Sequence, residues 1–362
     1  MFDYFVDEDI SKAETLPASF YKDDRVFDLL KTKVFTSSWQ WEGCAKELFP
    51  EDDYIQPINF IDGFLDEPLF LKRAGTGQVD CFSNVCTHRG SLIFHHECRS
   101  KRIACGYHGR TWDTEGKFTF MPEFKDVKDF PRACDHLKKF PVALLGSHVF
   151  TSLSPVFSIE SVFQKMKERI GFMPIELFKS NPEHSKDYLV NCHWALYCDN
   201  YLEGFHIPFV HNDLNDVLDY GSYTTELFDN GSLQIGYSKG GEDVFNLPSG
   251  HPDSGKDVAA YYYWVFPNMM FNFYPWGLSV NIIRPVSKNK TRVLFRSFVW
   301  DSSRLGEGAG AVLDKVERED EFVVEGVHKG LQSSTYQSGR FSPTREQGVH
   351  HFHRLLAQAI NE

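Results

Sequence analysis

The first part of the chain consists of short apolar runs separated by turn residues. Between residues 36 and 155, stretches such as "YIQPINFIDGF" and "FPVALLGSHVFTSL" are interrupted by Gly, Asn and Asp. Short runs with this punctuation are typical of strands joined by tight turns. The pattern predicts a small all-β domain over residues 36–155. A helical lead-in over residues 1–35 is expected to pack on the second domain, residues 156–362.

The second part of the chain mixes helical and strand-like periodicity. In "SIESVFQKMKERIGF", Val162, Met166 and Ile170 recur at helical spacing behind Ser158, a candidate N-cap. Residues 156–362 therefore predict an α+β domain. Its other expected elements are a strand-like "KDYLVNCHWALYCDN", a β-rich tract over about 223–300, a helix over about 309–331 and a tail helix, "HHFHRLLAQAI".

Composition and charge narrow the functional class. The 362 residues are 42% hydrophobic and 24% charged, as in an ordinary globular protein, and carry a net charge of -12. A nucleic-acid-binding protein is expected to have a basic surface, so this charge argues against one. No stretch approaches the roughly 18 apolar residues of a membrane span. The acidic "MFDYFVDEDISKAE" has no signal-peptide pattern, so we expect a cytoplasmic protein without a membrane partner.

The segment "NVCTHRGSLIFHHECRSKRIACGYHGRTWD" holds two Cys/His pairs, each expected at the tip of a β-hairpin. Cys86 and His88 are separated by one residue, and Cys105 and His108 by two. A zinc site of two cysteines and two histidines is one interpretation. A Rieske [2Fe–2S] cluster binds one iron through two cysteines and the other through two histidines. The cluster is favoured, because each loop supplies one ligand of each kind.

This segment resembles the Rieske motif of the non-haem iron oxygenases in "CTHRG" and "CGYHGRTW". Its loops lack the additional cysteines of high-potential Rieske proteins, which favours a lower potential. The resemblance spans about residues 36–335 and implies a mononuclear Fe(II) site in a helix-grip (START-like) catalytic domain with a curved antiparallel sheet. It also implies a homotrimer, since the two metal sites of one protomer are too far apart for electron transfer.

The stretch "CDNYLEGFHIPFVH" supplies two histidines for the second site. His206 and His211 would point about 140° apart on an ideal helix, so Pro208 is expected to break or kink the helix between them. Two histidines and one carboxylate form the arrangement expected for Fe(II) in oxygen chemistry.

Three further residues of this stretch receive a role from the resemblance. Glu203 lies one helical turn before His206 and is implied to connect it to His108 of a neighbouring subunit. Asn200 is implied to lie close to the metal, and Asp199 to support the site from further away. The alternative for Glu203 is a solvated acid on a helix.

The carboxylate ligand is expected in the acidic helix "AVLDKVEREDEFVVEGVHKGLQ". Six apolar residues of this helix fall within about 60° of Asp320, whereas Glu319 and Glu321 lie about 100° to either side and can reach solvent. A buried carboxylate needs a counter-charge such as a metal. Asp320 is therefore the expected ligand, with Glu317 and Glu321 as alternatives. The apolar residues are Leu313, Val316, Val323, Val324, Val327 and Leu331.

The tract "AAYYYWVFPNMMFNFYPWG" is rich in aromatic residues. Alternate residues of a strand face opposite sides, so about half could line a cavity above the iron. Such rings would bind a quaternary ammonium group by cation–π attraction or a planar ring in an apolar slot; a sheet core is the remaining interpretation. The candidates for a cage are Trp194, Tyr197, Tyr201, Tyr263, Phe271 and Tyr274.

Together these features predict the terminal oxygenase (alpha) subunit of a Rieske non-haem iron oxygenase. Glutamate at position 203 and "MPEF" after the Rieske loops make the resemblance nearest to the choline, carnitine and glycine-betaine monooxygenases. With O2 and electrons from an NAD(P)H-dependent flavin or ferredoxin-type reductase, the protein would hydroxylate, oxidatively cleave or demethylate a small organic substrate, for which a quaternary ammonium compound is a candidate. Monooxygenation is favoured over dioxygenation. No G-x-G-x-x-G motif follows a strand, so the chain is not expected to bind NAD itself. The alternatives are an aromatic-ring hydroxylating or O-demethylating oxygenase, a Rieske electron-transfer protein and a zinc-binding module.

Overall fold

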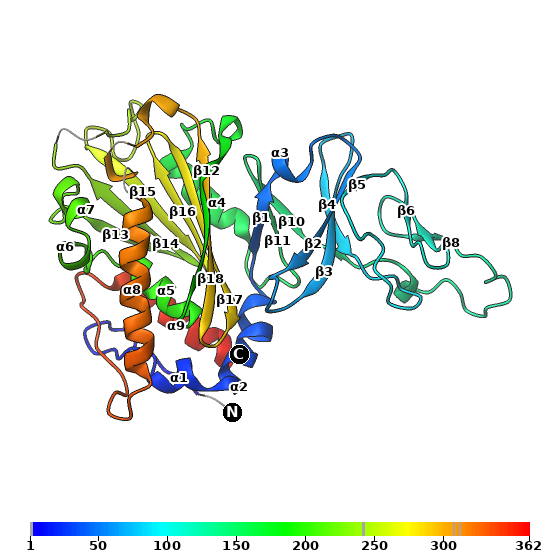
Figure 1. Ribbon diagram of the computed structural model, residues 1–362, viewed down its shortest axis with the longest axis horizontal. Helices are drawn as coiled ribbons and strands as arrows, with labels where there is room; N and C mark the ends of the chain where they lie inside the picture. Colours follow the sequence, from blue (N-terminus) through cyan, green and yellow to red (C-terminus); the bar gives the residue numbers. More distant parts are fainter. Residues whose placement is uncertain (1–2, 241–242, 307, 311–312) are drawn as a thin grey trace. The chain divides into compact units, whose positions relative to one another are not determined.

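The computed structural model describes residues 3–240, 243–306, 308–310 and 313–362. The chain divides into two compact units (Figure 1). The smaller unit is Trp39–Pro155, and the larger one combines the N-terminal residues up to Ser38 with Val156–Glu362. Residues 311 and 312, which fall within one predicted helix, lie outside the described residues.

The regular elements of the smaller unit are almost all short strands, in keeping with the predicted all-β domain. These are β1 (Gln40–Cys44), β2 (Tyr54–Phe60), β3 (Glu67–Arg73), β4 (Val79–Ser83), β5 (Cys98–Arg99), β6 (Ile103–Ala104), β7 (Thr111–Trp112), β8 (Phe118–Phe120), β9 (Lys139–Phe140), β10 (Val142–Leu145) and β11 (His148–Thr151), with helix α3 (Ala45–Leu48) and the 3-10 turn η2 (Ala133–Asp135). They form antiparallel sheets in the orders β5-β2-β3-β4-β9, β1-β11-β10 and β6-β7-β8.

The larger unit is built around one antiparallel sheet in the order β12-β18-β17-β16-β15-β14-β13. Its strands are β12 (Lys179–Val190), β13 (Thr224–Phe228), β14 (Gly231–Tyr237), β15 (Val258–Val265), β16 (Met269–Tyr274), β17 (Gly277–Ser287) and β18 (Lys290–Val299). Helix α8 (Leu313–Leu331) packs against α5 (Trp194–Tyr201), which in turn contacts β17 of the sheet (Figure 1). The predicted α+β class is confirmed.

The remaining helices of the larger unit are short, apart from one before the sheet and one at the end of the chain. They are α1 (Ala18–Lys22), α2 (Asp24–Leu30), the π-helix η1 (Lys31–Phe35), α4 (Ile159–Ile170), α6 (Ile207–Val210), α7 (Asn212–Val217) and α9 (Gln347–Asn361), with 3-10 turns η3 (Ile175–Leu177), η4 (Ser302–Arg304) and η5 (Gly308–Gly310). Ser158 is the N-cap residue of α4 as predicted, but its hydroxyl donates to Glu160 at 2.7 Å instead of accepting from the helix.

The strand predicted over residues 186–200 is wrong in its second half. The strand expected through residue 200 ends at Val190, and Trp194–Tyr201 form helix α5. The side chains from Trp194 to Cys198 are all buried, so the helix has no polar face whose spacing could reveal its period. The ring of His193 accepts a hydrogen bond from the Ala195 N–H at 3.3 Å and begins the helix.

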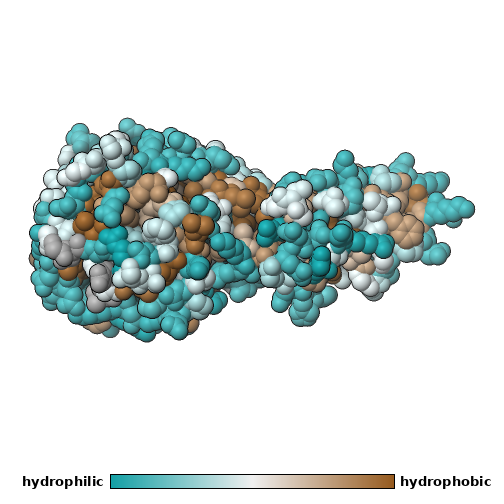
Figure 2. All heavy atoms as spheres, turned by 90° about the horizontal axis from the view of Figure 1, so that it is seen from above, coloured by the Kyte–Doolittle hydropathy of each residue, from teal (hydrophilic) through white to brown (hydrophobic). Residues whose placement is uncertain are grey.

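Most of the surface visible in Figure 2 is hydrophilic, and the apolar residues there gather in separate patches. Within the described parts of the chain, none of the helices has the length and apolar character needed to cross a membrane.

Candidate metal centres and substrate cavity

The two predicted Rieske loops share one backbone hydrogen-bond pattern. In each, the cysteine N–H donates at 2.8 Å to the carbonyl five residues further on. Gly90 and Gly109 donate back to the carbonyls of Cys86 and Cys105, at 3.0 and 3.1 Å. Both glycines have a φ near +70°, a conformation that glycine adopts readily. Only the second loop is the expected hairpin, between β6 and β7; an isolated bridge closes the first.

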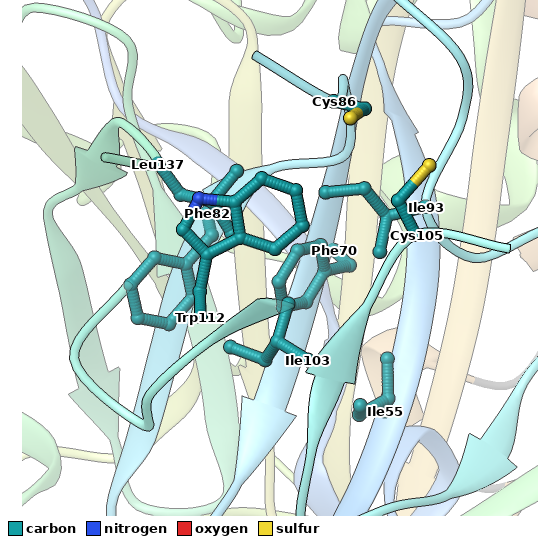
Figure 3. Packing of buried hydrophobic residues seen from close by; sticks show 9 residues of the cluster. All are labelled: Ile55, Phe70, Phe82, Cys86, Ile93, Ile103, Cys105, Trp112 and Leu137. Atoms are coloured by element: carbon teal, nitrogen blue, oxygen red, sulfur yellow. The ribbon is translucent and has the colours of Figure 1, made fainter. Parts of the chain in front are cut away.

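The loops separate the two predicted sulfur ligands from the two predicted nitrogen ligands. Cys86 and Cys105 are 4% and 2% exposed and lie at the edge of a packed apolar cluster (Figure 3). Burial, together with the neighbouring Cys105 thiol, raises the pKa of the Cys86 thiol. His88 is half-buried and His108 exposed, with ring centroids 4.9 Å apart. A buried sulfur pair beside a more exposed imidazole pair fits a Rieske cluster.

Asp135 in η2 holds both loops. Its carbonyl accepts from the Thr87 hydroxyl and the Trp112 indole N–H, each at 3.0 Å. Its carboxylate accepts from the Arg110 guanidinium at 2.6 Å and from the Arg132 N–H at 2.7 Å. Burial opposes ionisation of Asp135, but these donors outweigh it and lower the pKa of the carboxyl. We call Thr87, Arg110, Trp112 and Asp135 the Asp135 clamp.

The predicted iron histidines lie at the two ends of a short helix. His206 precedes α6 and His211 follows it, with ring centroids 5.0 Å apart. The expected break or kink at Pro208 is not found, because Pro208 lies in the first turn of α6, where a missing N–H costs no hydrogen bond. Glu203 accordingly lies in the turn after α5, not on a helical face shared with His206.

Asp320 completes a compact group with these histidines. Its Oδ1 lies 3.0 Å from His211 Nε2 and 3.5 Å from His206 Nε2. One donor atom from each of the three residues lies within 4.8 Å of the others, close enough to hold one metal ion. Two imidazoles and one carboxylate are the donors of non-haem Fe(II) sites. The structure therefore brings together the three residues expected from the sequence.

Each histidine has a second carboxylate on its other nitrogen. Glu203 Oε1 is 2.6 Å from His206 Nδ1, and Glu319 Oε2 is 2.7 Å from His211 Nδ1. Burial opposes a charge on His211, but Asp320 and Glu319 outweigh it and raise its pKa. Glu319 can reach solvent as expected, being 29% exposed, but its side chain also turns back to His211, a contact that the sequence did not predict. The sequence offered one sign of this contact, since Glu319 directly precedes the predicted ligand Asp320.

Asn200 and Asp199 have separate environments. Asn200 lines the cavity beside the metal-binding group. Asp199 accepts from the Tyr21 hydroxyl at 3.2 Å and lies 2.9 Å from His353 Nε2, which connects α5 to α1 and α9. Asp199 therefore supports α5 and does not contact the iron histidines.

A cavity of about 90 Å³ borders the metal-binding group. Acidic, amide and aromatic side chains form most of its wall, and none of its described lining residues is Lys or Arg. The aromatic part consists of Tyr197, Tyr201, Tyr223, Tyr262 and Tyr274.

Comparison with known proteins identifies the family. Residues 43–131 match the Rieske [2Fe-2S] domain, and residues 179–362 match the catalytic domain of the ring hydroxylating alpha subunit. The chain belongs to the ring-hydroxylating alpha subunit family. The predicted family is thus confirmed, and with it a Rieske oxygenase with a [2Fe–2S] cluster and a mononuclear iron. Neither match supports a zinc-binding or a purely electron-transferring protein.

Curated relatives of this alpha subunit cover nearly its whole length. Choline monooxygenase from Arabidopsis thaliana is 29% identical over 96% of the chain and 83% of the relative. The choline monooxygenase of Spinacia oleracea is 27% identical over 96% of the chain and 79% of the relative. The carnitine monooxygenase oxygenase subunit of Escherichia coli is 27% identical over 97% of the chain and 95% of the relative.

Solved structures show the same fold. The quaternary ammonium Rieske monooxygenase CntA with L-carnitine matches with a TM-score of 0.73 at 21% identity, over 97% of each chain. Naphthalene 1,2-dioxygenase from Rhodococcus sp. matches with a TM-score of 0.70 at 15% identity, over 96% of this chain and 94% of that one.

Strand alternation decides which aromatic residues of this alpha subunit reach the cavity. Tyr262 faces it, whereas Tyr261 and Tyr263 point to the other side of β15, where Tyr261 bonds to Asp253 at 3.0 Å. Of the expected cage residues, Tyr197, Tyr201 and Tyr274 line the cavity, and Trp194, Tyr263 and Phe271 do not. The sequence missed Tyr223 and Tyr262, which join the cavity only through the folding of the sheet.

Proposed function

We propose that this alpha subunit is the oxygenase component of a monooxygenase that oxidises a quaternary ammonium compound. The observation that carries the proposal is the ring of tyrosines around the cavity that borders His206, His211 and Asp320. Ring faces attract alkylammonium groups, and a tyrosine-lined cavity can hold such a headgroup without hydrogen bonds to it. The names of relatives similar over 96% of the chain or more point to choline and carnitine chemistry.

The proposed metal ligands form two sets. The mononuclear iron would supply the oxygen activation that amino-acid side chains lack. Glu203 pairs with Nδ1 of His206, and Glu319 pairs with Nδ1 of His211. The Nε2 atom of each ring then faces Asp320. Asn200 would contact the substrate from the cavity wall. The ligands are Cys86, His88, Cys105 and His108 for the cluster, and His206, His211 and Asp320 for the iron.

We also propose a cytoplasmic homotrimer that receives electrons from an NAD(P)H-dependent reductase. Exposed aromatic side chains lie near both sites: the ring of Tyr107, 63% exposed, packs against that of His108, and Phe205 and Phe209 precede and follow His206 along the chain. Exposed apolar groups in such places are typical of protein interfaces. In this assembly Glu203 would connect His206 to His108 of a neighbouring subunit. Inter-subunit electron transfer has been described for the structurally similar monooxygenase CntA.

The proposal is tested by oxygen uptake with the iron-loaded protein, NADH and a surrogate reductase. Choline, carnitine, glycine betaine and simple aromatic acids would be offered in turn, with Asp320→Ala as the control for uncoupled reduction of oxygen. We expect uptake coupled to product with at least one quaternary ammonium compound. Coupled uptake with aromatic acids alone would replace the proposal by aromatic-ring oxidation. If protein with an intact cluster spectrum shows no coupled uptake with any of these compounds, the proposal is overturned.

A further inference from the structure

One glutamine of the sheet holds two parts of the cavity wall at once. Gln234 lies in β14, where every residue except the last is buried, and is itself 1% exposed. Its Nε2 donates to the carbonyl of Tyr201 at 2.7 Å, and its Oε1 accepts from the Tyr223 hydroxyl at 3.2 Å. A buried amide is costly unless its polar atoms have such partners. Gln234 thus joins the end of α5 to the residue that precedes β13.

The end of α5 is tied to the sheet a second time. The hydroxyl of Tyr201 lies 2.6 Å from Oδ1 of Asn272 on β16 and 3.1 Å from the carbonyl oxygen of Tyr263 on β15. Tyr201 is the last residue of α5 and precedes Glu203 by two positions. Three neighbouring strands therefore fix the backbone that leads into the turn over residues 203–206, which carries Glu203 and His206.

The ring of Tyr223 packs against that turn. A Cβ atom added to Gly204 would lie 2.9 Å from Cε1 of Tyr223, which is closer than such atoms pack in proteins. Gly204 does not have the left-handed backbone conformation that favours glycine, so its contact with this ring accounts for the residue type. Because Tyr223 also lines the cavity, one ring belongs both to the cavity wall and to the support of the turn.

We propose that Gln234 is a positioning residue, which keeps the tyrosine wall of the cavity and the turn with Glu203 and His206 in fixed places relative to each other. This inference rests on the proposed function and goes beyond its ligand assignments. Through Tyr201, Gln234 fixes the start of the turn, and through Tyr223 it fixes the ring on which Gly204 packs. A small displacement of the groups around a reacting centre lowers activity strongly, so these two hydrogen bonds control both substrate and metal binding.

Two variants and their combination test this role. Gln234→Met keeps the length of the side chain and removes both hydrogen bonds, whereas Tyr223→Phe removes only one of them. We expect Gln234→Met to weaken the binding of choline and carnitine, measured by calorimetry, and of Fe(II), measured by chelator competition, each about tenfold. Tyr223→Phe should weaken both about threefold. The double variant should be no worse than Gln234→Met, because the two substitutions remove the same hydrogen bond.

Gly204→Ala tests the contact from the side of the turn. Its methyl group would press on the Tyr223 ring, so we expect the affinity for Fe(II) to fall about tenfold. Adding Tyr223→Leu, which shortens the side chain in front of that methyl group, should recover most of the Fe(II) affinity. If the second substitution recovers none of it, the ring of Tyr223 does not position the turn.

Tyr261→Phe is the matched control, because it removes a buried tyrosine hydroxyl, bonded to Asp253, on the other side of β15. It should lower the melting temperature and leave both affinities and the cluster spectrum unchanged. If Gln234→Met behaves in the same way, or if the losses add in the double variant, the role of Gln234 is overturned and the proposed function stands. Tyr223→Phe keeps the shape of the ring and decides the question if Gln234→Met does not fold, since unchanged affinities would then overturn the role. If the parent protein oxidises no quaternary ammonium compound, the proposed function itself fails.

Discussion

The chemistry of single residues at the proposed iron site depends on which nitrogen of each histidine would face the metal. Glu203 Oε1 lies 2.6 Å from Nδ1 of His206, and Glu319 Oε2 lies 2.7 Å from Nδ1 of His211. The Nε2 atoms are thereby directed at Asp320. A carboxylate behind a metal-binding histidine fixes the ring and makes its free nitrogen a better ligand.

Replacing Glu319 with glutamine tests this effect. Glu319→Gln keeps the size of the side chain but removes its charge, so we expect the affinity for Fe(II) to fall about 10- to 100-fold. Chelator competition measures the affinity, and the cluster spectrum should not change. Glu321→Gln is the matched control, since Glu321 contacts Arg318 and neither histidine. Equal losses in the two variants would assign the effect to the overall charge of α8.

At the scale of elements, the Asp135 clamp joins two loops that are separated along the chain. Arg110 is 2% exposed, and its guanidinium lies 5.1 Å from the ring centroid of Phe118 and 5.4 Å from that of Phe130. A charge buried among rings depends on its acidic partner. The positions of both cluster loops therefore depend on one ion pair and on two hydrogen bonds to the Asp135 carbonyl.

Asp135→Asn should loosen the clamp without emptying its space. Loss of one partner from a buried ion pair costs about 3–5 kcal/mol, so we expect a lower melting temperature and faster loss of the cluster absorbance on heating. Glu115→Gln breaks the exposed pair with Lys139 in the same unit and should cost no more than about 1 kcal/mol. If both variants lose the cluster at the same rate, the clamp does not hold the loops.

At the scale of the whole molecule, the proposed trimer makes each active site depend on two chains. In such a ring, one subunit would contribute the cluster and its neighbour the iron. The exposed aromatic residues beside His108 and beside His206 are the surfaces that this arrangement would cover. Activity would then be a property of the junction between subunits.

Mixed trimers test this dependence. His108→Ala should remove the cluster from one subunit, and Asp320→Ala the iron from another, so each variant alone should be inactive. Trimers that contain both, isolated through two different tags, should recover about one third of the parental rate, because every mixed ring contains one functional junction. Inactive mixed trimers with full metal loading of the intact sites would contradict electron transfer between subunits.

The sequence revealed the parts of the site whose residues are neighbours along the chain. The two Rieske loops hold their ligands within four residues each, and His206 and His211 flank a single helical turn. Asp320 was predicted as the carboxylate because helical periodicity places it among apolar residues, and the structure brings it beside both histidines.

Contacts between distant elements could not be predicted in the same way. Glu319 reaches His211 across more than a hundred residues, and Tyr223 and Tyr262 meet only because β13, β14 and β15 pair. Helix α5 escaped detection because its first five side chains are all buried.

The hydrogen bonds of Asp199 have a consequence for truncating or tagging the protein. Through Tyr21 and His353, helix α5 is tied to helices near both ends of the chain, although no described residue of α1 or α9 lines the cavity. Trimming the termini, or fusing a bulky tag that displaces α9, would disturb the helix that leads into the iron-binding turn. Expression designs for this enzyme should therefore keep Tyr21 and His353 and place tags on long, flexible extensions.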